Sequence, residues 1–278
     1  MYKIIEKKDL TEVTKLFVVD APHVARNALP GHFVIVRVDE KGERIPLTIA
    51  DFDKKRGTVT IVVQEVGYTS ALLNRLGAGD SIIDFAGPLG KEAPMRQDGS
   101  VALLGGGFGV APIYPIAKEL KLREVRVTSI IGARSKDLVI LEEEMRSVSD
   151  ELHVCTDDGS AGFKGFVTQK LETLVASGSS FDEAIAIGPM PMMRAAALST
   201  KPMGLKTWVS MDPIMVDGTG MCGACRITVA GKVKFGCVDG PFFDAQDVDF
   251  DEALRRNRIY KQQENEIYEP CRRGGEAR

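Results

Sequence analysis

The chain has 278 residues, 44% of them hydrophobic, and a formal net charge of −3 from 36 basic and 39 acidic side chains. This length exceeds one ordinary domain, and the slightly acidic balance argues against a general nucleic-acid surface. There is no run of about 18 apolar residues, as a membrane span would need, and the N-terminus MYKIIEKKDL lacks the apolar segment of a signal peptide. We therefore expect a cytoplasmic protein of two or more domains that binds neither nucleic acid nor membrane.

The first hundred residues are predicted to form β-structure. Runs rich in Val, Ile and Phe are expected to be strands at Leu16–Asp20, Phe33–Val38, Thr58–Gln64 and Ser81–Phe85. Turn pairs such as Pro30-Gly31 lie between them, and a short helix is expected at Ser70–Leu76. Several short strands at this spacing are typical of a small antiparallel barrel, which we assign to residues 1–97.

After the polar stretch Lys91–Ser100, expected strands and helices alternate. The strands are expected at Val101–Leu104, Val125–Ile131, Leu152–Cys155 and Ala184–Ile187, and the helices at Ile113–Leu120, Leu138–Arg146, Val167–Ala176 and Met192–Leu198. This alternation predicts an α/β doubly wound domain with a parallel sheet over residues 98–205. The rhythm ends at Lys206. Residues 206–278 are predicted to be a small third unit with a hairpin around Gly231 and a charged tail.

A glycine-rich turn, LLGGGFGVAP, stands where the first strand of the α/β domain becomes a helix. Glycines let the backbone approach a pyrophosphate, and free N–H groups at a helix start attract its charge. A tight turn that only needs small residues is an equal alternative for this motif alone. Two further turns follow predicted strands and so lie at the same carboxyl edge of the sheet, where ligands bind. The candidate nucleotide-binding residues are Gly105, Gly106, Gly107, Gly109, Asp157, Asp158, Gly188, Pro189 and Met190.

Two segments of the barrel are candidates for holding a flavin. Arg44, Pro46, Leu47 and Thr48 stand in one segment that carries a cation, a rigid proline and a hydroxyl group suited to an isoalloxazine edge. Gly67, Tyr68, Thr69 and Ser70 open the short helix, where amides and hydroxyls can hold a phosphate. An exposed edge-strand arginine and an ordinary helix N-cap are the simpler interpretations of the two segments.

Three of the five cysteines fall within sixteen residues, in the pattern C-x2-C-x11-C of Cys222, Cys225 and Cys237. Cytoplasmic cysteines are more often thiols or metal ligands than disulfides. Structural zinc needs four ligands, and the histidine closest in sequence is the distant His153. Asp217 completes D-x4-C-x2-C-x11-C, the plant-type [2Fe–2S] spacing with aspartate in the first place. Asp-Gly is equally a common turn pair.

The other two cysteines, Cys155 and Cys271, are interpreted as structural or surface thiols.

With these motifs in view, the chain resembles the flavin and iron–sulfur electron-transfer subunits related to ferredoxin–NADP reductase, over nearly its whole length. Two branches of that family are relevant. The electron-transfer subunit of dihydroorotate dehydrogenase B uses four cysteines. The small subunit of NADH-dependent reduced ferredoxin:NADP oxidoreductase uses aspartate and three cysteines, and the stretch DPIMVDGTGMCGACRITV is similar to it.

The resemblance implies roles for individual residues. It places Thr48 at the flavin, residues 67–70 at the FAD pyrophosphate, residues 106–109 at the nicotinamide nucleotide's pyrophosphate, and the loop from Gly188 to Met193 on the nicotinamide side. The wider superfamily carries R-x-Y-S at the flavin. Here Ile45–Thr48 takes that place, with arginine one position upstream at Arg44 and leucine in place of the stacking tyrosine.

The resemblance also implies the function. NAD(H) would exchange hydride with FAD, and single electrons would pass through a [2Fe–2S] cluster held by Asp217, Cys222, Cys225 and Cys237 to a larger flavin and iron–sulfur subunit that reacts with ferredoxin in electron bifurcation. No catalytic proton-transfer residue is required. Arg134 follows the second strand of the sheet, where an arginine suits a 2′-phosphate, and pairing with the pyrophosphate or a place in solvent are equal alternatives. The resemblance favours NAD(H), with NADP(H) as the alternative. The alternatives are a dihydroorotate dehydrogenase subunit and a zinc-stabilised, non-redox interaction module.

Overall fold

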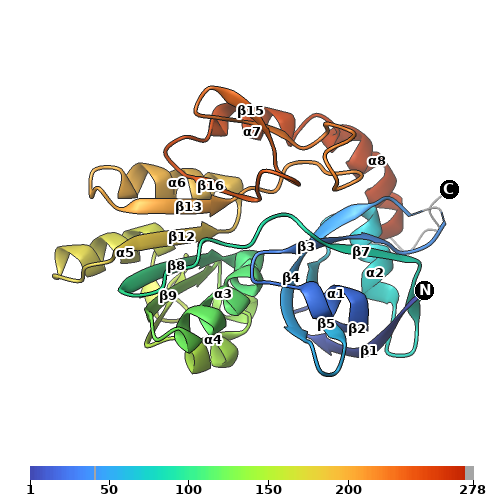
Figure 1. The fold of residues 1–278 in the computed structure, drawn as a ribbon, viewed down its shortest axis with the longest axis horizontal. Coiled ribbons are helices and arrows are strands. Elements are labelled where there is room, and N and C mark those ends of the chain that lie inside the picture. The colour runs from blue at the N-terminus through green and yellow to red at the C-terminus, as the bar shows by residue number, and fades with distance from the viewer. Residues whose placement is uncertain (41, 273–278) are drawn as a thin grey trace.

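The computed structural model of the chain describes residues 1–40 and 42–272. A β-barrel and an α/β domain lie side by side, and the C-terminal segment lies across both of them (Figure 1). This is the fold class expected from the sequence. Within the described residues, no helix is both long and apolar enough to cross a membrane.

The barrel is a nearly closed antiparallel sheet of seven strands in the order β6-β1-β2-β5-β4-β3-β7. The strands are β1 (Tyr2–Asp9), β2 (Thr14–Asp20), β3 (Phe33–Arg37), β4 (Ile45–Asp53), β5 (Thr58–Gln64), β6 (Ser81–Ile82) and β7 (Asp84–Leu89), accompanied by helices α1 (Pro22–Asn27) and α2 (Tyr68–Arg75). Strands β1 and β4 were not among those expected from the sequence. In β1 only Ile4 is buried and most of the other side chains are charged, so the strand carries little apolar pattern. In β4, Pro46 interrupts the pattern near its start.

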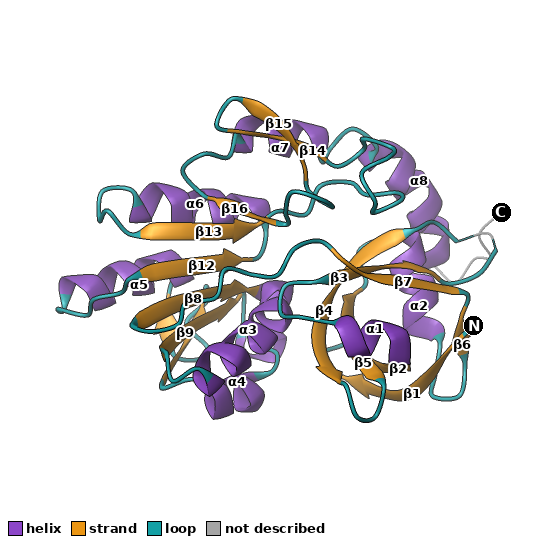
Figure 2. Ribbon diagram, in the orientation of Figure 1, coloured by secondary structure: helices purple, strands orange, loops and turns teal. Residues whose placement is uncertain are grey.

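The α/β domain is a seven-stranded sheet in the order β11-β10-β9-β8-β12-β13-β16, with helices packed on it (Figure 2). Its strands are β8 (Ser100–Gly106), β9 (Arg126–Ala133), β10 (Glu151–Thr156), β11 (Phe163–Lys164), β12 (Glu183–Ile187), β13 (Lys206–Ser210) and β16 (Phe242–Asp244). Its helices are α3 (Val110–Leu122), α4 (Glu142–Val148), α5 (Val167–Ala176) and α6 (Met190–Thr200), with single turns of 3₁₀ helix at η1 (Gly107–Gly109) and η2 (Lys136–Leu138). Six strands are parallel and β16 is antiparallel. From β8 the chain first builds one side of the sheet and then returns to add β12 on the other side, so a topological switch point lies between β8 and β12.

The segment after residue 205 has two parts. β13 and β16 extend the α/β sheet, so this sheet continues into residues that the sequence analysis assigned to the third unit. Between them lie the cysteine loop and a hairpin of β14 (Arg226–Val229) and β15 (Lys232–Phe235), which confirms the predicted turn at Gly231. Helices α7 (Phe250–Arg256) and α8 (Lys261–Arg272) follow, and Tyr268 of α8 donates a hydrogen bond of 3.1 Å to Glu65 in the barrel.

The barrel and the α/β domain are in direct contact. Lys118 of α3 lies 3.0 and 3.1 Å from the two carboxylate oxygens of Asp51 on β4. Two barrel residues, Ala50 and Val62, join the hydrophobic core of the α/β domain. Because these contacts fix the barrel against the sheet, the parts that carry the candidate site are held in one arrangement.

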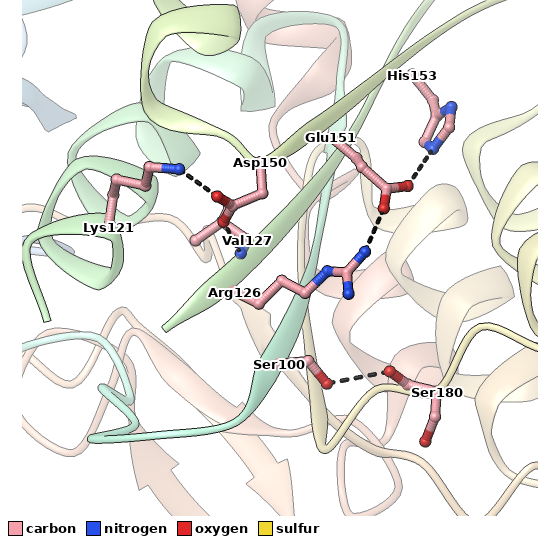
Figure 3. A network of polar contacts seen from close by, with 8 residues as sticks. All are labelled: Ser100, Lys121, Arg126, Val127, Asp150, Glu151, His153 and Ser180. Atoms are coloured by element: carbon pink, nitrogen blue, oxygen red, sulfur yellow. Dashed lines mark hydrogen bonds and ion pairs between the residues drawn. The ribbon is translucent and has the colours of Figure 1, made fainter. Parts of the chain in front are cut away.

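A polar network ties the amino-terminal ends of the α/β strands together (Figure 3). Arg126 on β9 pairs with Glu151 on β10 at 2.6 Å, and the backbone N–H of Val127 donates to Asp150 at 2.8 Å. His153 faces Glu151, with 3.6 Å between its Nε2 atom and the carboxylate. Since parallel strands all start at this edge, these polar groups hold the sheet at the end opposite to its ligand-binding edge.

Candidate redox site

The outer face of the barrel near β4 carries the residues predicted to contact a flavin. Leu47 is 9% exposed and packs into the barrel core, whereas Pro46 and Thr48 alternate to the other face of the strand. In the antiparallel register Thr48 stands opposite Phe33, and Pro46 stands opposite Ile35. Opposed residues share one face of the sheet. Pro46 and Thr48 therefore lie beside Phe33 and Ile35, while Leu47 is directed away from them.

Two cluster cysteines lie against that same face of the barrel. Cys225 and Cys237 are 1% and 3% exposed and pack with Phe33 and Ile35 of β3. Their Sγ atoms are 3.2 Å apart. The candidate flavin residues and the cysteines come from distant parts of the sequence, yet the neighbouring strands β3 and β4 bring them together.

The half-buried Asp217 and the exposed Cys222 form the outer side of the cysteine loop. The two carboxylate oxygens of Asp217 accept hydrogen bonds of 2.7 Å from the backbone N–H groups of Thr219 and Cys222. These backbone hydrogen bonds lower the pKa of Asp217, so its carboxyl group is ionised. Asp217 is thus a turn residue, as one interpretation of its sequence expected, and each oxygen still has a lone pair for a metal.

The donor set fits a two-iron cluster. In the described part of the chain, no three His, Cys, Asp or Glu side chains are grouped so that they could hold one metal ion. A closed zinc site needs four converging ligands, whereas each iron of a [2Fe–2S] cluster takes two protein ligands. Cys225 and Cys237, with Sγ atoms 3.2 Å apart, are placed to supply one such pair, and Asp217, which accepts from the Cys222 backbone N–H, is placed to supply another with Cys222. His153 lies on β10 and is not part of the cysteine loop.

The thiol of Cys237 is protonated in the absence of a metal. Burial, together with the neighbouring Cys225 thiol, raises the pKa of Cys237 to about 12. A bound metal removes the proton from a coordinating thiol outright. The interpretation of Cys155 as a structural thiol agrees with its complete burial in the α/β sheet, whereas the side chain of Cys271 lies outside the described residues.

The start of α2 presents the second candidate flavin segment. A Cβ atom at Gly67 would meet nothing within 4 Å, so the helix end is open. Ser70 Oγ accepts hydrogen bonds of 3.0 Å from the backbone N–H groups of Val66 and Gly67, and donates one to the Gly67 carbonyl. Thr69 is buried, with its hydroxyl 3.5 Å from Glu43. Ser70 therefore caps the helix, and the open backbone at Gly67, beside the half-buried Tyr68, is the part suited to a phosphate.

The glycines between β8 and α3 divide into two groups. A Cβ atom at Gly109 would lie 2.0 Å from the Ile187 carbonyl oxygen, and one at Gly105 would lie 2.6 Å from Ile113, so both glycines are needed for packing. Gly107 has a φ of 53° and open space where a side chain would stand. The tight-turn interpretation thus holds for Gly105 and Gly109, while Gly107 suits the close approach of a ligand.

The loop after β12 differs in detail from the sequence prediction. Met190 and Met193 are buried in the core between sheet and helices. Met192 is partly buried against the same core, and its sulfur lies beside the loop glycines: a Cβ atom at Gly106 would lie 2.3 Å from it, and one at Gly188 would lie 3.0 Å from it. Met192 therefore lies at the ligand edge. Met190, Met193 and Ala197 are the buried residues of this part of α6, whereas Met192 is only partly buried, so a part of its side chain is left for a ligand.

The turns after β9 and β10 lie next to each other. The backbone N–H of Asp158 donates to the Arg134 carbonyl at 3.2 Å. The Asp158 carboxylate accepts bonds from the backbone and hydroxyl of Ser160, which lower its pKa and engage it in the turn. Asp157 and Arg134 are exposed charged side chains in these two turns.

The fold and site define a class of protein. The arrowheads of β12 and β13 point toward the barrel (Figure 2), so the ligand-binding edge of the α/β sheet faces it. The cysteine loop packs on the barrel face that carries Thr48. This is the architecture of a flavin- and nicotinamide-dependent oxidoreductase with an iron–sulfur centre.

Comparisons with known proteins agree with this class. Residues 1–93 match the oxidoreductase FAD-binding domain, residues 103–197 the oxidoreductase NAD-binding domain, and residues 212–249 the iron–sulfur cluster binding domain of dihydroorotate dehydrogenase B. The chain is 47% identical, over 96% of its length and 94% of the relative's, to the homologue of the dihydroorotate dehydrogenase B (NAD(+)) electron transfer subunit from Thermotoga maritima. It is 48% identical, over 95% and 92%, to an uncharacterised protein in the adh 3′ region of Clostridium beijerinckii.

One chain of known structure is similar to this protein over almost the full length of both. It comes from a structure of NADH-dependent reduced ferredoxin–NADP oxidoreductase that addresses flavin-based electron bifurcation, with 45% identity, a TM-score of 0.93, and coverage of 98% of this chain and 97% of that one. The protein belongs to the family of dihydroorotate dehydrogenase B electron transfer subunits and their homologues. Its cofactors are FAD, NAD(H) and an iron–sulfur cluster.

Proposed function

We propose that the chain is the small, electron-transferring subunit of a bifurcating NADH/ferredoxin:NADP oxidoreductase. It exchanges hydride between NAD(H) and FAD and passes single electrons through a [2Fe–2S] cluster to a larger flavin and iron–sulfur subunit. The observation that carries this proposal is the shared barrel face, where Thr48 and the buried pair Cys225 and Cys237 lie beside the same strand, β3. The similarity to the bifurcating oxidoreductase chain supports the choice of branch.

The cluster is proposed to bind two pairs of ligands. Cys225 and Cys237 would hold one iron on the barrel side, and Asp217 and Cys222 would hold the other on the exposed side. FAD, when bound, supplies the conversion between two-electron hydride transfer and one-electron transfer. The chain's own part is to hold these groups in place and to exclude water from the barrel side, where Phe33 and Ile35 are buried.

The nicotinamide nucleotide is proposed to be NAD(H). The open backbone at Gly107 and the start of α3 suit its pyrophosphate. The Asp157 carboxylate, exposed at the end of β10, suits ribose hydroxyls and would repel a 2′-phosphate. Met192, at the ligand edge beside Gly106 and Gly188, would contact the nicotinamide end.

The larger subunit is proposed to cover the cysteine loop. Met221 is 88% exposed and precedes the exposed Cys222, and Val216 and Val238 are 48% and 45% exposed in the same module. Exposed apolar side chains of this kind suit a protein interface. An electron leaving through the Asp217 and Cys222 side would then enter the partner directly.

The alternative within the family is a dihydroorotate dehydrogenase subunit, favoured by the match of residues 212–249 to the cluster domain of that enzyme. Affinity purification from the native host separates the two. Recovery of a large flavin and iron–sulfur subunit supports our proposal, and recovery of a dihydroorotate-oxidising subunit contradicts it. A purified protein without a flavin absorbance at about 450 nm would contradict both of these functions.

The role of Asp217 is tested by the variants Asp217→Cys and Asp217→Asn, with the exposed Asp247→Asn in the same module as control. If Asp217 binds iron, Asp217→Cys shifts the EPR spectrum and potential of the reduced cluster, and Asp217→Asn lowers iron content. Unchanged spectra and iron content in both variants would show that the aspartate is only a turn residue.

A further inference from the structure

Two arginines contact the back of the cysteine loop. Arg226, at the start of β14, donates from Nη1 to the Gly223 carbonyl at 2.6 Å. Arg256, at the end of α7, donates from Nη2 to the Ala224 carbonyl at 3.2 Å. Both carbonyls belong to the turn between Cys222 and Cys225, and Arg256 lies beyond residues 212–249, which match the cluster domain. Neither the nucleotide sites nor the ligand set uses these arginines.

One peptide group joins Arg226 to a cluster sulfur. The carbonyl that Arg226 contacts and the N–H of Ala224 belong to the same peptide, and that N–H donates to Cys222 Sγ at 3.5 Å. In a planar trans peptide the C=O and N–H groups point in opposite directions. Guanidinium, peptide and sulfur therefore form one continuous chain of hydrogen bonds. A charged donor on the carbonyl polarises the peptide and strengthens the bond from its N–H.

The loop is shaped for this contact. Gly223 has a φ of 66°, a conformation that favours glycine, and a Cβ atom there would lie 3.1 Å from Arg226 Nη1. Among the described residues, neither Arg226 nor Arg256 has a carboxylate partner within the ion-pair distance of 4.0 Å. Their positive charges are thus directed at the cysteine loop and are not neutralised by a neighbour.

We propose that Arg226, assisted by Arg256, is a positioning residue that raises the affinity of the cluster for its electron. This inference rests on the proposed function, because it requires Cys222 to be a cluster ligand. Reduction adds one negative charge to the cluster, and hydrogen bonds to its sulfurs stabilise that charge and raise the potential. The Arg226–peptide–Cys222 chain favours the reduced state by this route, and α7 serves to place the second arginine.

The test measures the ratio of reduced to oxidised cluster in the purified holoprotein at fixed potentials by EPR, together with iron content. Arg226→Gln keeps a hydrogen-bond donor but loses the charge, and should lower the ratio roughly three- to tenfold. A tenfold change corresponds to about 59 mV for a one-electron couple. Arg226→Lys should retain most of the wild-type ratio. The control is Arg255→Gln, which removes a charge from the same helix as Arg256 but does not contact the loop.

Two results would overturn the inference. One is an unchanged ratio in Arg226→Gln with full iron content. The other is an equal change in Arg255→Gln, which would indicate a general surface-charge effect. If Arg226→Gln loses iron, Arg256→Gln decides, since it leaves the Arg226 contact intact: a lowered ratio supports the inference and an unchanged ratio refutes it. A wild-type protein without any iron–sulfur signal would instead refute the proposed function.

Discussion

Substitution of Gly109 by alanine should damage hydride transfer more than its small size suggests. Gly109 has a φ of −61°, which alanine adopts readily, so the change introduces no backbone strain. At such a position glycine-to-alanine usually stabilises a protein by roughly 0.4–1 kcal/mol. Here the added Cβ atom would lie 2.0 Å from the Ile187 carbonyl oxygen and 2.8 Å from Gly188 Cα. The effect of this substitution is therefore purely steric, and it lowers the stability of the protein where glycine-to-alanine would usually raise it.

The magnitude follows from these distances. Ordinary contact begins at 3.4 Å, so relieving a 2.0 Å approach needs a displacement of about 1.4 Å between η1 and the end of β12. The atoms that would be struck are backbone atoms, which no side-chain rotation can move. Overpacking of this kind costs roughly 1–3 kcal/mol, or roughly 2–12 °C in Tm for a protein of this size. A misplacement of about 1 Å at a reacting centre can cost about 100-fold in rate.

The assay is stopped-flow reduction of the bound FAD by NADH, alongside thermal unfolding. Gly204→Ala is the control, because Gly204 has a φ of 64° but no atom within 4 Å of an added Cβ. It should lower Tm through backbone strain and leave the rate of FAD reduction unchanged. A Gly109→Ala protein with the wild-type Tm and a rate within about twofold of wild type would refute the reasoning from packing.

Three further predictions concern other parts of the molecule. Gly218→Ala forces a side chain into a φ of 78° and to within 2.7 Å of Leu89 on the barrel, so iron and sulfide content should fall; full cluster content would contradict this. Burial raises the pKa of Cys155 from 9.0 to about 11. Between these pH values the thiol of the unfolded chain loses its proton while that of the folded chain keeps it. The free energy of unfolding therefore falls as the pH rises through this range. Cys155→Ala should remove that part of the slope, up to about 1.4 kcal/mol per pH unit, and parallel pH profiles for the two proteins would argue against it. Lys118→Met breaks the ion pair with Asp51. Because the side chains of Lys118 and Asp51 are 44% and 33% exposed, the substitution should lower the free energy of unfolding by only roughly 0.2–1 kcal/mol at low salt. The loss should shrink in about 1 M salt, and a salt-independent loss would point to packing instead.

The cysteine pattern was readable from the sequence because three of its four candidate ligands lie in one loop, and the fourth, Cys237, follows the hairpin of β14 and β15. Cys222 and Cys225 are three residues apart, and Asp217 folds back to the Cys222 backbone, so local geometry places them together. The alternation of strands and helices likewise predicted the α/β sheet, since each helix packs on the strands next to it in the chain. The glycine turn was found for the same reason.

The sequence prediction was weaker where burial pattern was absent or ambiguous. Strand β1 was not predicted because most of its side chains are charged, and β4 was not predicted because Pro46 interrupts its pattern. Met190 and Met193 were predicted to lie at the ligand, but both are buried in the core, because a short helical segment by itself does not show which of its faces meets the sheet. The position of Leu47 inside the barrel follows from the register of β4 with β3, which no local motif reveals.

By itself, the sequence determined the classes of cofactor, which are FAD, NAD(H) and an iron–sulfur cluster, and the succession of barrel, α/β domain and cysteine module; it also offered Asp217 to Cys237 as the candidate ligand set. Only the tertiary structure decided how these parts work together. It placed the cysteines against β3 beside Thr48, and Arg256 of α7 against the cysteine loop. These residues lie far apart in the chain, and they meet because the buried apolar side chains of the barrel, the sheet and the cysteine module pack together.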